Sequence, residues 1–342
     1  MDYGSAQEAI AQAQGMTAEQ ASSLLELFVS GQLSADEGGQ LLTQLAQRGE
    51  TAAEIAAFVR GLQAKSVQIP WSDGAADCCG TGGSGRSRFN VSTAAAMVVS
   101  ACGIPVAKHG NKGSRRPNGS FDLLEVLGVP LELDVAAQQT LLEEFNLTFC
   151  FARMHHPAMK AVVPYRQAAG GRSIFNLAGP LANPAGVNCQ VVGVCDQSTA
   201  SVVAQALHDL GQHRAVVVTG GDGWDEFVVD GPNRLLEVRE DGISERILEP
   251  QYGYEHVGLL PGGDSQVNAA LFHDLIEGRH QGPLFDLLCL ASGAVIDTWN
   301  GRAVEDHGPG VAQAREALES GTVSRHFDAF LLKARSLAQA PI

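Results

Sequence analysis

The sequence is short of positive charge, which narrows what the protein binds. It has 23 Lys and Arg residues against 38 Asp and Glu residues, so its formal net charge is −15 at pH 7. Proteins that bind nucleic acid or anionic membranes need clustered Lys and Arg for phosphate contacts, and this balance argues against both partners. An anionic substrate would therefore need a local basic pocket.

Long apolar runs and a recognisable leader are also missing. No apolar stretch approaches the roughly 20 residues of a membrane-spanning helix. Residues 1–14, MDYGSAQEAIAQAQ, lack the basic region and apolar core of a signal peptide. The seven cysteines form neither a CxxC pair nor a zinc-ligand spacing. We expect a protein of the reducing cytoplasm, with no nucleic-acid or membrane partner.

Residues 1–66 predict a small N-terminal helical domain. Three segments each begin with a Ser or Thr that is followed, three residues later, by Glu or Gln, which is the pattern of a capping box. The three pairs are Thr17 with Gln20, Ser34 with Glu37, and Thr51 with Glu54. We expect helices from about residues 153–170 to join this domain.

Residues 67–342 predict a larger α/β domain with a mostly parallel central sheet. The strand candidates are apolar on both faces and β-branched, and helix-length segments separate them, which is typical of βαβ units. The candidates are residues 66–71, 104–109, 147–152, 189–195 and 215–220. Helices are expected near residues 92–103, 199–213, 265–277, 283–296 and 323–338.

The sequences of two further segments predict turns. Residues 227–250 favour antiparallel hairpins, with turns at residues 231–232 and 241–242. Residues 175–185, FNLAGPLANPA, contain several stop residues and predict a rigid bend of successive turns.

A glycine-rich loop precedes one of the predicted helices. Four glycines lie between Gly80 and Gly85. Glycine lets the backbone approach a ligand closely, and the free N–H groups of a following helix point at an anion. Asn90, Ser92 and Thr93 either cap the helix or donate to phosphate. The alternative is a flexible turn before a capped helix, since the loop lacks the GKS or GKT ending of a P-loop.

Positive side chains gather after the strand predicted at residues 104–109. Lys108, Lys112, Arg115 and Arg116 lie within nine residues, in a stretch that contains Gly and Asn. Open α/β sheets bind ligands at the carboxyl ends of their strands, so this loop and the glycine loop can face one crevice. The alternative is a solvated loop.

Two further elements carry side chains suited to binding. Asp225 and Glu226 lie together at the start of a predicted strand, where paired carboxylates can share a hard cation such as Mg²⁺ or simply face solvent. Arg166 lies on a predicted helix, where it clamps a carboxylate or remains a surface charge.

Together these motifs resemble those of the anthranilate phosphoribosyltransferase family of tryptophan biosynthesis. The resemblance covers about residues 5–335. It rests on GTGGSG (80–85), NVST (90–93), KHGN (108–111), HPAM (156–159), Pro164 with Arg166, FNLAGPLANP (175–184), DE (225–226), and GGD (262–264) with Asn268.

The resemblance implies a reaction and a set of ligands. The family transfers the phosphoribosyl group of phosphoribosyl pyrophosphate (PRPP) to the amine of anthranilate, with Mg²⁺, and releases pyrophosphate. It implies a site in the crevice between the two domains and a homodimer formed through the helical domain. No general base is assigned.

The resemblance also implies roles for individual residues. Anthranilate would contact Gly80, Asn111 and Arg166, and magnesium would bind Ser92, Asp225 and Glu226. The residues expected to bind PRPP are Gly80, Gly83, Ser84, Arg88, Asn90, Val91, Ser92, Thr93, Lys108, Arg115, Arg116 and Ser120.

The chain departs from the family pattern in the expected PRPP site. Ser84 replaces the Asp of GTGGDG, Arg88 replaces a small polar residue, and Arg115 and Arg116 replace serines. These changes are neutral drift, a direct arginine grip on pyrophosphate that reduces reliance on one Mg²⁺, or signs of a different donor or acceptor. The alternatives to the family reaction are therefore a related phosphoribosyltransferase, a nucleoside phosphorylase-like enzyme, or a non-catalytic ligand-binding relative.

Overall fold

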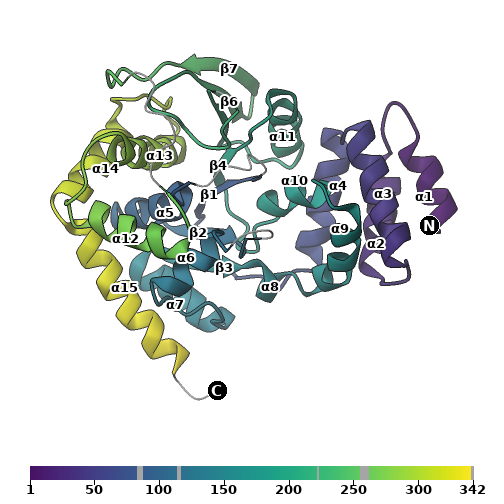
Figure 1. The fold of residues 1–342 in the computed structure, drawn as a ribbon, viewed down its shortest axis with the longest axis horizontal. Helices are drawn as coiled ribbons and strands as arrows, with labels where there is room; N and C mark the ends of the chain where they lie inside the picture. The colour runs from purple at the N-terminus through teal and green to yellow at the C-terminus, as the bar shows by residue number, and fades with distance from the viewer. Residues whose placement is uncertain (83–87, 114–116, 222, 255–261, 340–342) are drawn as a thin grey trace.

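The computed structural model describes residues 1–82, 88–113, 117–221, 223–254 and 262–339. In Figure 1 a group of helices that includes the N-terminus lies beside a larger part built around a β-sheet. The expected fold class, a helical domain followed by an α/β domain, is confirmed.

The N-terminal helices begin where the sequence predicts them. They are α1 (Tyr3–Ile10), α2 (Ala18–Val29), α3 (Ala35–Arg48) and α4 (Ala52–Ala64). Thr17, Ser34 and Thr51 each form the predicted capping box, in which the side chain accepts the N–H of the third helical residue. The fully buried Glu54 also accepts the N–H of Met16 at 2.8 Å, so one carboxylate holds two segments together.

A second chain segment completes this helical part. It contains α8 (Ala152–His155), a 3₁₀ helix (Pro157–Val162), α9 (Val163–Ala169) and α10 (Ile174–Leu181). Helix α9 packs closely on α3 because Gly38 and Gly39 have no Cβ, which would collide with Tyr165 and Ala168. The Phe28 and Phe58 rings both pack edge-on against Phe175, with ring centroids 5.7 and 5.6 Å apart. The helical core is therefore assembled from two separate stretches of sequence.

The rigid bend expected over residues 175–185 is wrong, because α10 occupies most of it. The Ser173–Asn176 capping box starts the helix, and its apolar residues are buried. Pro180 lies in the last turn. The stop residues therefore end a helix and do not form successive turns.

Within the described residues the strands form one seven-stranded sheet in the order β3-β2-β1-β4-β5-β6-β7. Strands β1 to β5 run parallel, and β6 and β7 are antiparallel to their neighbours. The strands are β1 (Ala76–Gly80), β2 (Val106–Gly110), β3 (Leu147–Phe151), β4 (Cys189–Gly193), β5 (Ala215–Gly220), β6 (Asn233–Arg239) and β7 (Gly242–Leu248). The hairpin predicted at residues 241–242 is confirmed, and so are the four strands predicted between residues 104 and 220.

Two predicted strands are wrong. Residues 66–71 form an extended linker whose Val67 and Ile69 N–H groups donate to the carbonyls of His155, at the end of α8, and Pro184, so within the described part of the chain no neighbouring strand pairs with it. Residues 225–230 form a loop, because the Asn233 side chain bonds both the N–H and the carbonyl of Val228 where a strand partner would lie. The strand before the glycine loop is instead β1, whose buried Asp77 interrupts the apolar pattern.

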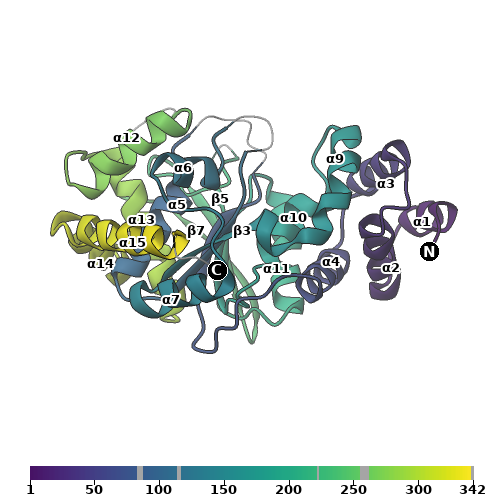
Figure 2. The same ribbon diagram turned by 90° about the horizontal axis from the view of Figure 1, so that it is seen from below.

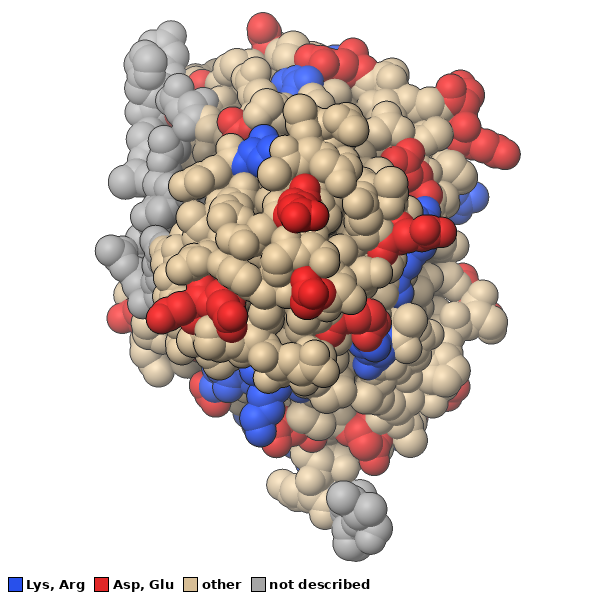
Figure 3. Space-filling view, turned by 90° about the vertical axis from the view of Figure 1, so that its right-hand side faces the viewer, with Lys and Arg blue, Asp and Glu red and all other residues tan. Residues whose placement is uncertain are grey.

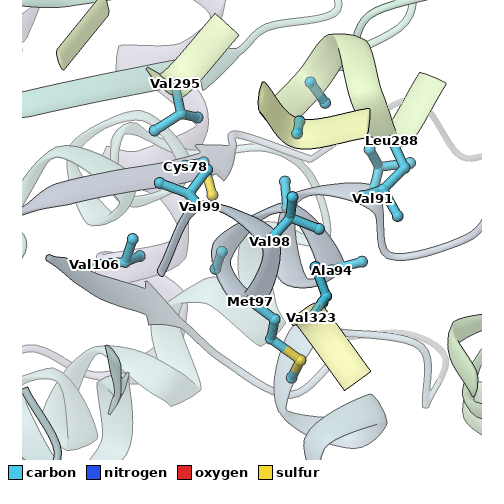
Figure 4. Packing of buried hydrophobic residues seen from close by; sticks show 14 of the residues in the cluster. Cys78, Val91, Ala94, Met97, Val98, Val99, Val106, Leu288, Val295 and Val323 are labelled. Carbon is cyan, nitrogen blue, oxygen red and sulfur yellow. The ribbon is translucent and has the colours of Figure 1, made fainter. Parts of the chain in front are cut away.

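Helices cover both faces of the sheet. One face carries α5, α6, α7, α12, α13, α14 and α15, and the other carries α11 and the helical part (Figures 1 and 2). Figure 4 shows α5 with Val91, Ala94 and Val98 packed among Leu288 and other apolar side chains. None of the described helices combines the length and apolarity that crossing a membrane requires.

The bounds of these helices are α5 (Val91–Ala101), α6 (Ser120–Val126), α7 (Val135–Phe145), α11 (Gln197–Asp209), α12 (Ser265–Ile276), α13 (Pro283–Trp299), α14 (Pro309–Glu319) and α15 (Thr322–Ala338). The five helices predicted in this part of the chain are confirmed as α5, α11, α12, α13 and α15.

Candidate functional site

The strand order creates a topological switch point at one edge of the sheet. The parallel strands β1 to β5 all end at the same edge, and β1 lies beside β4. Helix α5 follows β1 on one face, whereas α11 follows β4 on the other. The chain therefore turns away in opposite directions after these two strands, and open α/β sheets bind ligands at such a switch point.

The loop that carries Asp225 lies across the ends of these two strands. Gly80 and Gly193 pair at the last register position of β1 and β4. A Cβ at Gly193 would collide with the carbonyl of Asp225, and one at Gly80 would lie 3.2 Å from its Oδ2. Both glycines therefore allow Asp225 to lie fully buried at the switch point.

Arg88 binds the two neighbouring carboxylates. Its Nη2 donates to Asp225 Oδ2 at 2.8 Å, its Nη1 donates to Asp225 Oδ1, and its Nε lies 3.3 Å from Glu226 Oε1. Burial alone would lower the pKa of Arg88, but Glu226 and Asp225 raise it above the usual arginine value. Burial raises the pKa of Glu226 to about 7, and Arg88 opposes that rise.

The N-terminus of α5 lies beside this cluster. Asn90 is the N-cap residue, but its side chain does not cap the helix. It donates to the Asn118 carbonyl at 2.9 Å and accepts from Asn268 at 2.7 Å. Asn268 also donates to the Arg88 carbonyl at 3.0 Å, so it fixes the backbone before the helix. Capping by the Asn90 side chain is therefore wrong. In the first turn the Val91 and Thr93 N–H groups donate to the carbonyls of Phe89 and Asn90, and among the described residues the Ser92 N–H has no acceptor.

The next residues along α5 differ in burial. Val91 and Thr93 are buried, and Ser92 is half-buried. Among the described residues the Thr93 hydroxyl has no hydrogen-bond partner.

The positively charged residues predicted to gather after β2 have different environments in the structure. Lys108 lies within the strand, 2% exposed, and its Nζ donates to the Cys78 carbonyl of β1 at 2.7 Å. Lys112 forms an ion pair with Glu125 at 2.8 Å. Gly83, Ser84, Arg115 and Arg116 lie outside the described residues.

The remaining residues expected at the site follow β2 and β3. Asn111 is exposed just after β2, and the Ser120 hydroxyl donates to its carbonyl at 3.3 Å. Arg166 lies on α9, and its Nη2 donates to Asn176 Oδ1 at 3.4 Å. Among the described residues Arg166 forms no ion pair, and burial lowers its pKa. Its charge is therefore not neutralised within that part of the chain.

Sequence reasoning missed a buried polar network between β1, β2 and the segment that follows α10. Asn183 donates to Asp77 Oδ2 at 2.9 Å and to the Ala107 carbonyl at 2.7 Å, which joins β1 and β2 to the segment after α10. Burial raises the pKa of Asp77 to about 6. The signal was the second asparagine of FNLAGPLANP, to which the sequence alone gave no chemistry.

The carboxylates of Asp225 and Glu226 are suitable ligands for a hard cation, but Arg88 already occupies the position that the cation would take. Two carboxylates are ordinary ligands for Mg²⁺. Within the described residues no group of three or more His, Cys, Asp or Glu side chains is arranged to hold a metal. Arg88 already contacts both carboxylates, so the residues do not fit a metal at this pair while Arg88 stays there.

A helical bundle beside an α/β domain, with Gly80 and Gly193 paired at the switch point, is the architecture of a two-domain glycosyl transferase. Residues 6–66 match a family model described as the helical bundle domain of a glycosyl transferase family, and residues 72–324 match the a/b domain of such a family. A relative from Desulfatibacillum aliphaticivorans named anthranilate phosphoribosyltransferase is 38% identical over 94% of this chain and 96% of its own length. The chain belongs to the anthranilate phosphoribosyltransferase family.

Solved structures agree with this assignment. Anthranilate phosphoribosyltransferase from Thermus thermophilus superposes with a TM-score of 0.88 at 37% identity, covering 98% of this chain and all of the other. The Saccharomyces cerevisiae enzyme, in complex with PRPP and Mg, shares the fold with a TM-score of 0.84 at 23% identity and 98% coverage of both chains.

Proposed function

We propose that this protein transfers the phosphoribosyl group of PRPP to the amine of anthranilate. The observation that carries the proposal is the convergence of Gly80 at the end of β1, the α5 N-terminus and the Asp225–Glu226 loop at the switch point of a chain from this family. In the reaction the bond from ribose C1 to pyrophosphate breaks and a bond from C1 to the amine nitrogen forms. The nitrogen then loses one proton, and pyrophosphate leaves.

The donor half of the site would bind PRPP by its phosphates. In the first turn of α5 the Ser92 N–H would donate to an anion, and Ser92 and Thr93 add hydroxyl groups. Lys108 would add a cation near the end of β1, where its Nζ donates to the Cys78 carbonyl. Preorganised donors of this kind stabilise charge that develops on the leaving pyrophosphate.

The acceptor half would bind anthranilate through its carboxylate. The Arg166 guanidinium has an amide neighbour and, in the described part of the chain, no carboxylate partner. Arginine binds a carboxylate through two parallel hydrogen bonds, which would orient the neighbouring amine. Asn111, exposed after β2, would add a polar contact. Because the amine is neutral and already nucleophilic, positioning would supply much of the rate.

Magnesium would enter with PRPP. The yeast relative binds both together, and Ser92 offers a hydroxyl ligand in the half-buried first turn of α5. A metal at Asp225 and Glu226 would first have to displace Arg88.

The helical part would also form a homodimer. Figure 3 faces this end of the molecule and shows a mainly uncharged surface with scattered acidic groups. Light scattering after size-exclusion chromatography measures the mass, and we expect twice that of the 35.9 kDa chain.

The direct test follows the fluorescence of anthranilate after the protein is mixed with PRPP and Mg²⁺. We expect the fluorescence to fall with time, and not to fall without PRPP. EDTA measures how far turnover depends on added metal. Folded protein that shows no turnover would overturn the proposal, and pyrophosphate release with substituted aromatic acids would then separate an altered acceptor from a non-catalytic relative.

A further inference from the structure

The family pattern has a small polar residue where this chain has Arg88, and this difference changes the charge of the site. The side chain is 21% exposed, and it pairs with a fully buried Asp225 and with Glu226, whose side chain is 15% exposed. Adjacent buried carboxylates repel each other and need a cation nearby. Arg88 supplies that cation from within the chain.

Arg88 does more than balance the charge of the two carboxylates, because its nitrogen atoms are aligned with individual carboxylate oxygens. Nη1 and Nη2 face the two oxygens of Asp225, while Nε faces Glu226. A guanidinium presents its donors in a rigid planar fork, so it can engage both carboxylates at once. These are the same oxygens that would ligate a divalent metal.

Both partners of this contact are held by their own backbones. Asn268 donates to the Arg88 carbonyl, and a Cβ on Gly262 would collide with the backbone of Arg88 and Phe89. Asp225 is held over the ends of β1 and β4, where Gly193 leaves room for its carbonyl. The backbones that carry the two side chains are therefore both fixed, which keeps the guanidinium within reach of the carboxylates.

We propose that Arg88 is the resident cation of the Asp225–Glu226 pair, and that a divalent metal binds this pair only when Arg88 is removed. The inference rests on the proposed function only for the expectation that a metal would visit these carboxylates. Its test measures metal binding without substrates, so a failure of catalysis does not affect it.

The first experiment titrates Mn²⁺ into the full-length protein and follows the free ion by electron paramagnetic resonance. Arg88→Thr should bind one Mn²⁺ at least about tenfold more tightly than the wild type, because the competing buried cation is gone. The double variant Arg88→Thr/Asp225→Asn should lose that gain. Arg234→Thr, which removes an arginine from the surface pair with Glu245, is the matched control and should leave Mn²⁺ binding unchanged.

The second experiment needs no variant at Arg88. Trp224 precedes Asp225, so Mn²⁺ bound to the pair would quench its fluorescence, and Trp224→Phe isolates that signal from Trp71 and Trp299. We expect no Trp224-dependent quenching of the wild type at millimolar Mn²⁺. Quenching at micromolar Mn²⁺, or wild-type Mn²⁺ binding as tight as that of Arg88→Thr, would overturn the proposal.

Discussion

Two half-buried arginines of the chain respond to burial in opposite ways. Arg88 is paired with two carboxylates of the same chain, and their charge raises its pKa. Arg166 has an amide at 3.4 Å and no ion-pair partner among the described residues, and burial lowers its pKa. A neutralised guanidinium holds the protein together, whereas an unneutralised one is available to an anionic ligand. Residue type alone does not separate these roles.

The largest loss of stability should follow from removing the Asp225 carboxylate, which forms an ion pair with Arg88. Asp225→Asn should lower the free energy of unfolding by about 3 kcal/mol, because it leaves a largely buried guanidinium with one carboxylate fewer. Urea unfolding at pH 7 measures this loss. The control Glu245→Gln breaks an ion pair with 52% of its carboxylate side chain exposed, and should cost less than about 1 kcal/mol. Equal losses would mean that the Arg88 pair is no stronger than a surface pair.

Loss of the unpaired arginine should act on binding rather than on stability. Arg166→Gln should raise the KM for anthranilate about 10- to 100-fold, since a charge-assisted hydrogen bond contributes about 1.5–3 kcal/mol. The KM for PRPP should hardly change. Steady-state kinetics measures both constants, with Arg60→Gln, on the exposed side of α4, as the control. A rise confined to the KM for PRPP would move Arg166 to the donor half.

A buried basic side chain can also avoid the cost of burying a charge by staying neutral. The pH dependence of stability distinguishes such a group from a charged group that is held by an ion pair. Burial lowers the pKa of His156 to about 4, below its ordinary 6.5. Between these two pKa values His156 binds a proton in the unfolded chain but not in the native state. The free energy of unfolding should therefore fall by about 1–2 kcal/mol as the pH drops from 6.5 towards 4.5. His156→Asn should flatten this fall in urea unfolding.

Asp77 should act in the opposite direction over the same range. Burial raises its pKa to about 6 from an ordinary 3.8, so the native state keeps a proton that the unfolded chain has lost. Its contribution to stability is present at low pH and disappears as the pH rises towards 6. Asp77→Asn should therefore steepen the acid loss. An unchanged slope in both variants would show that other groups set the pH dependence.

The smallest effect is expected at Lys112, which resembles Arg88 in having a carboxylate partner but lies near the surface. Its partner Glu125 has 58% of its side chain exposed, and such pairs contribute little. Lys112→Ala should change the KM for PRPP by less than about twofold and the unfolding free energy by less than about 0.5 kcal/mol. A tenfold rise in that KM would show that the lysine leaves Glu125 to bind the donor.

Features encoded within a few residues were predictable from the sequence. The capping boxes that begin at Thr17, Ser34 and Thr51 join residues three apart, and they fixed the starts of α2, α3 and α4. Residues 66–71 and 225–230 have strand-like composition but no neighbouring strand, and pairing is decided by the whole sheet. Local pattern does not contain that information.

The site shows the same limit. The motifs located the loops that meet at the ends of β1 and β4, because each motif is local. The sequence also marked Arg88 as unusual, and its binding to PRPP stays a prediction. Its carboxylate partners within the chain lie 137 and 138 positions away, and only the fold brings them together.

The two-part helical core has a consequence for synthesis on the ribosome. When residues 1–66 have emerged, Phe28 and Phe58 still lack Phe175, the ring that packs against both. Strands β1, β2 and β3 are translated before α10 appears. Until α10 is synthesised, the N-terminal helices therefore expose apolar rings, and exposed apolar surface promotes aggregation. Translation speed through residues 67–181 sets how long that exposure lasts, so chaperone demand during synthesis should fall when this stretch is decoded faster.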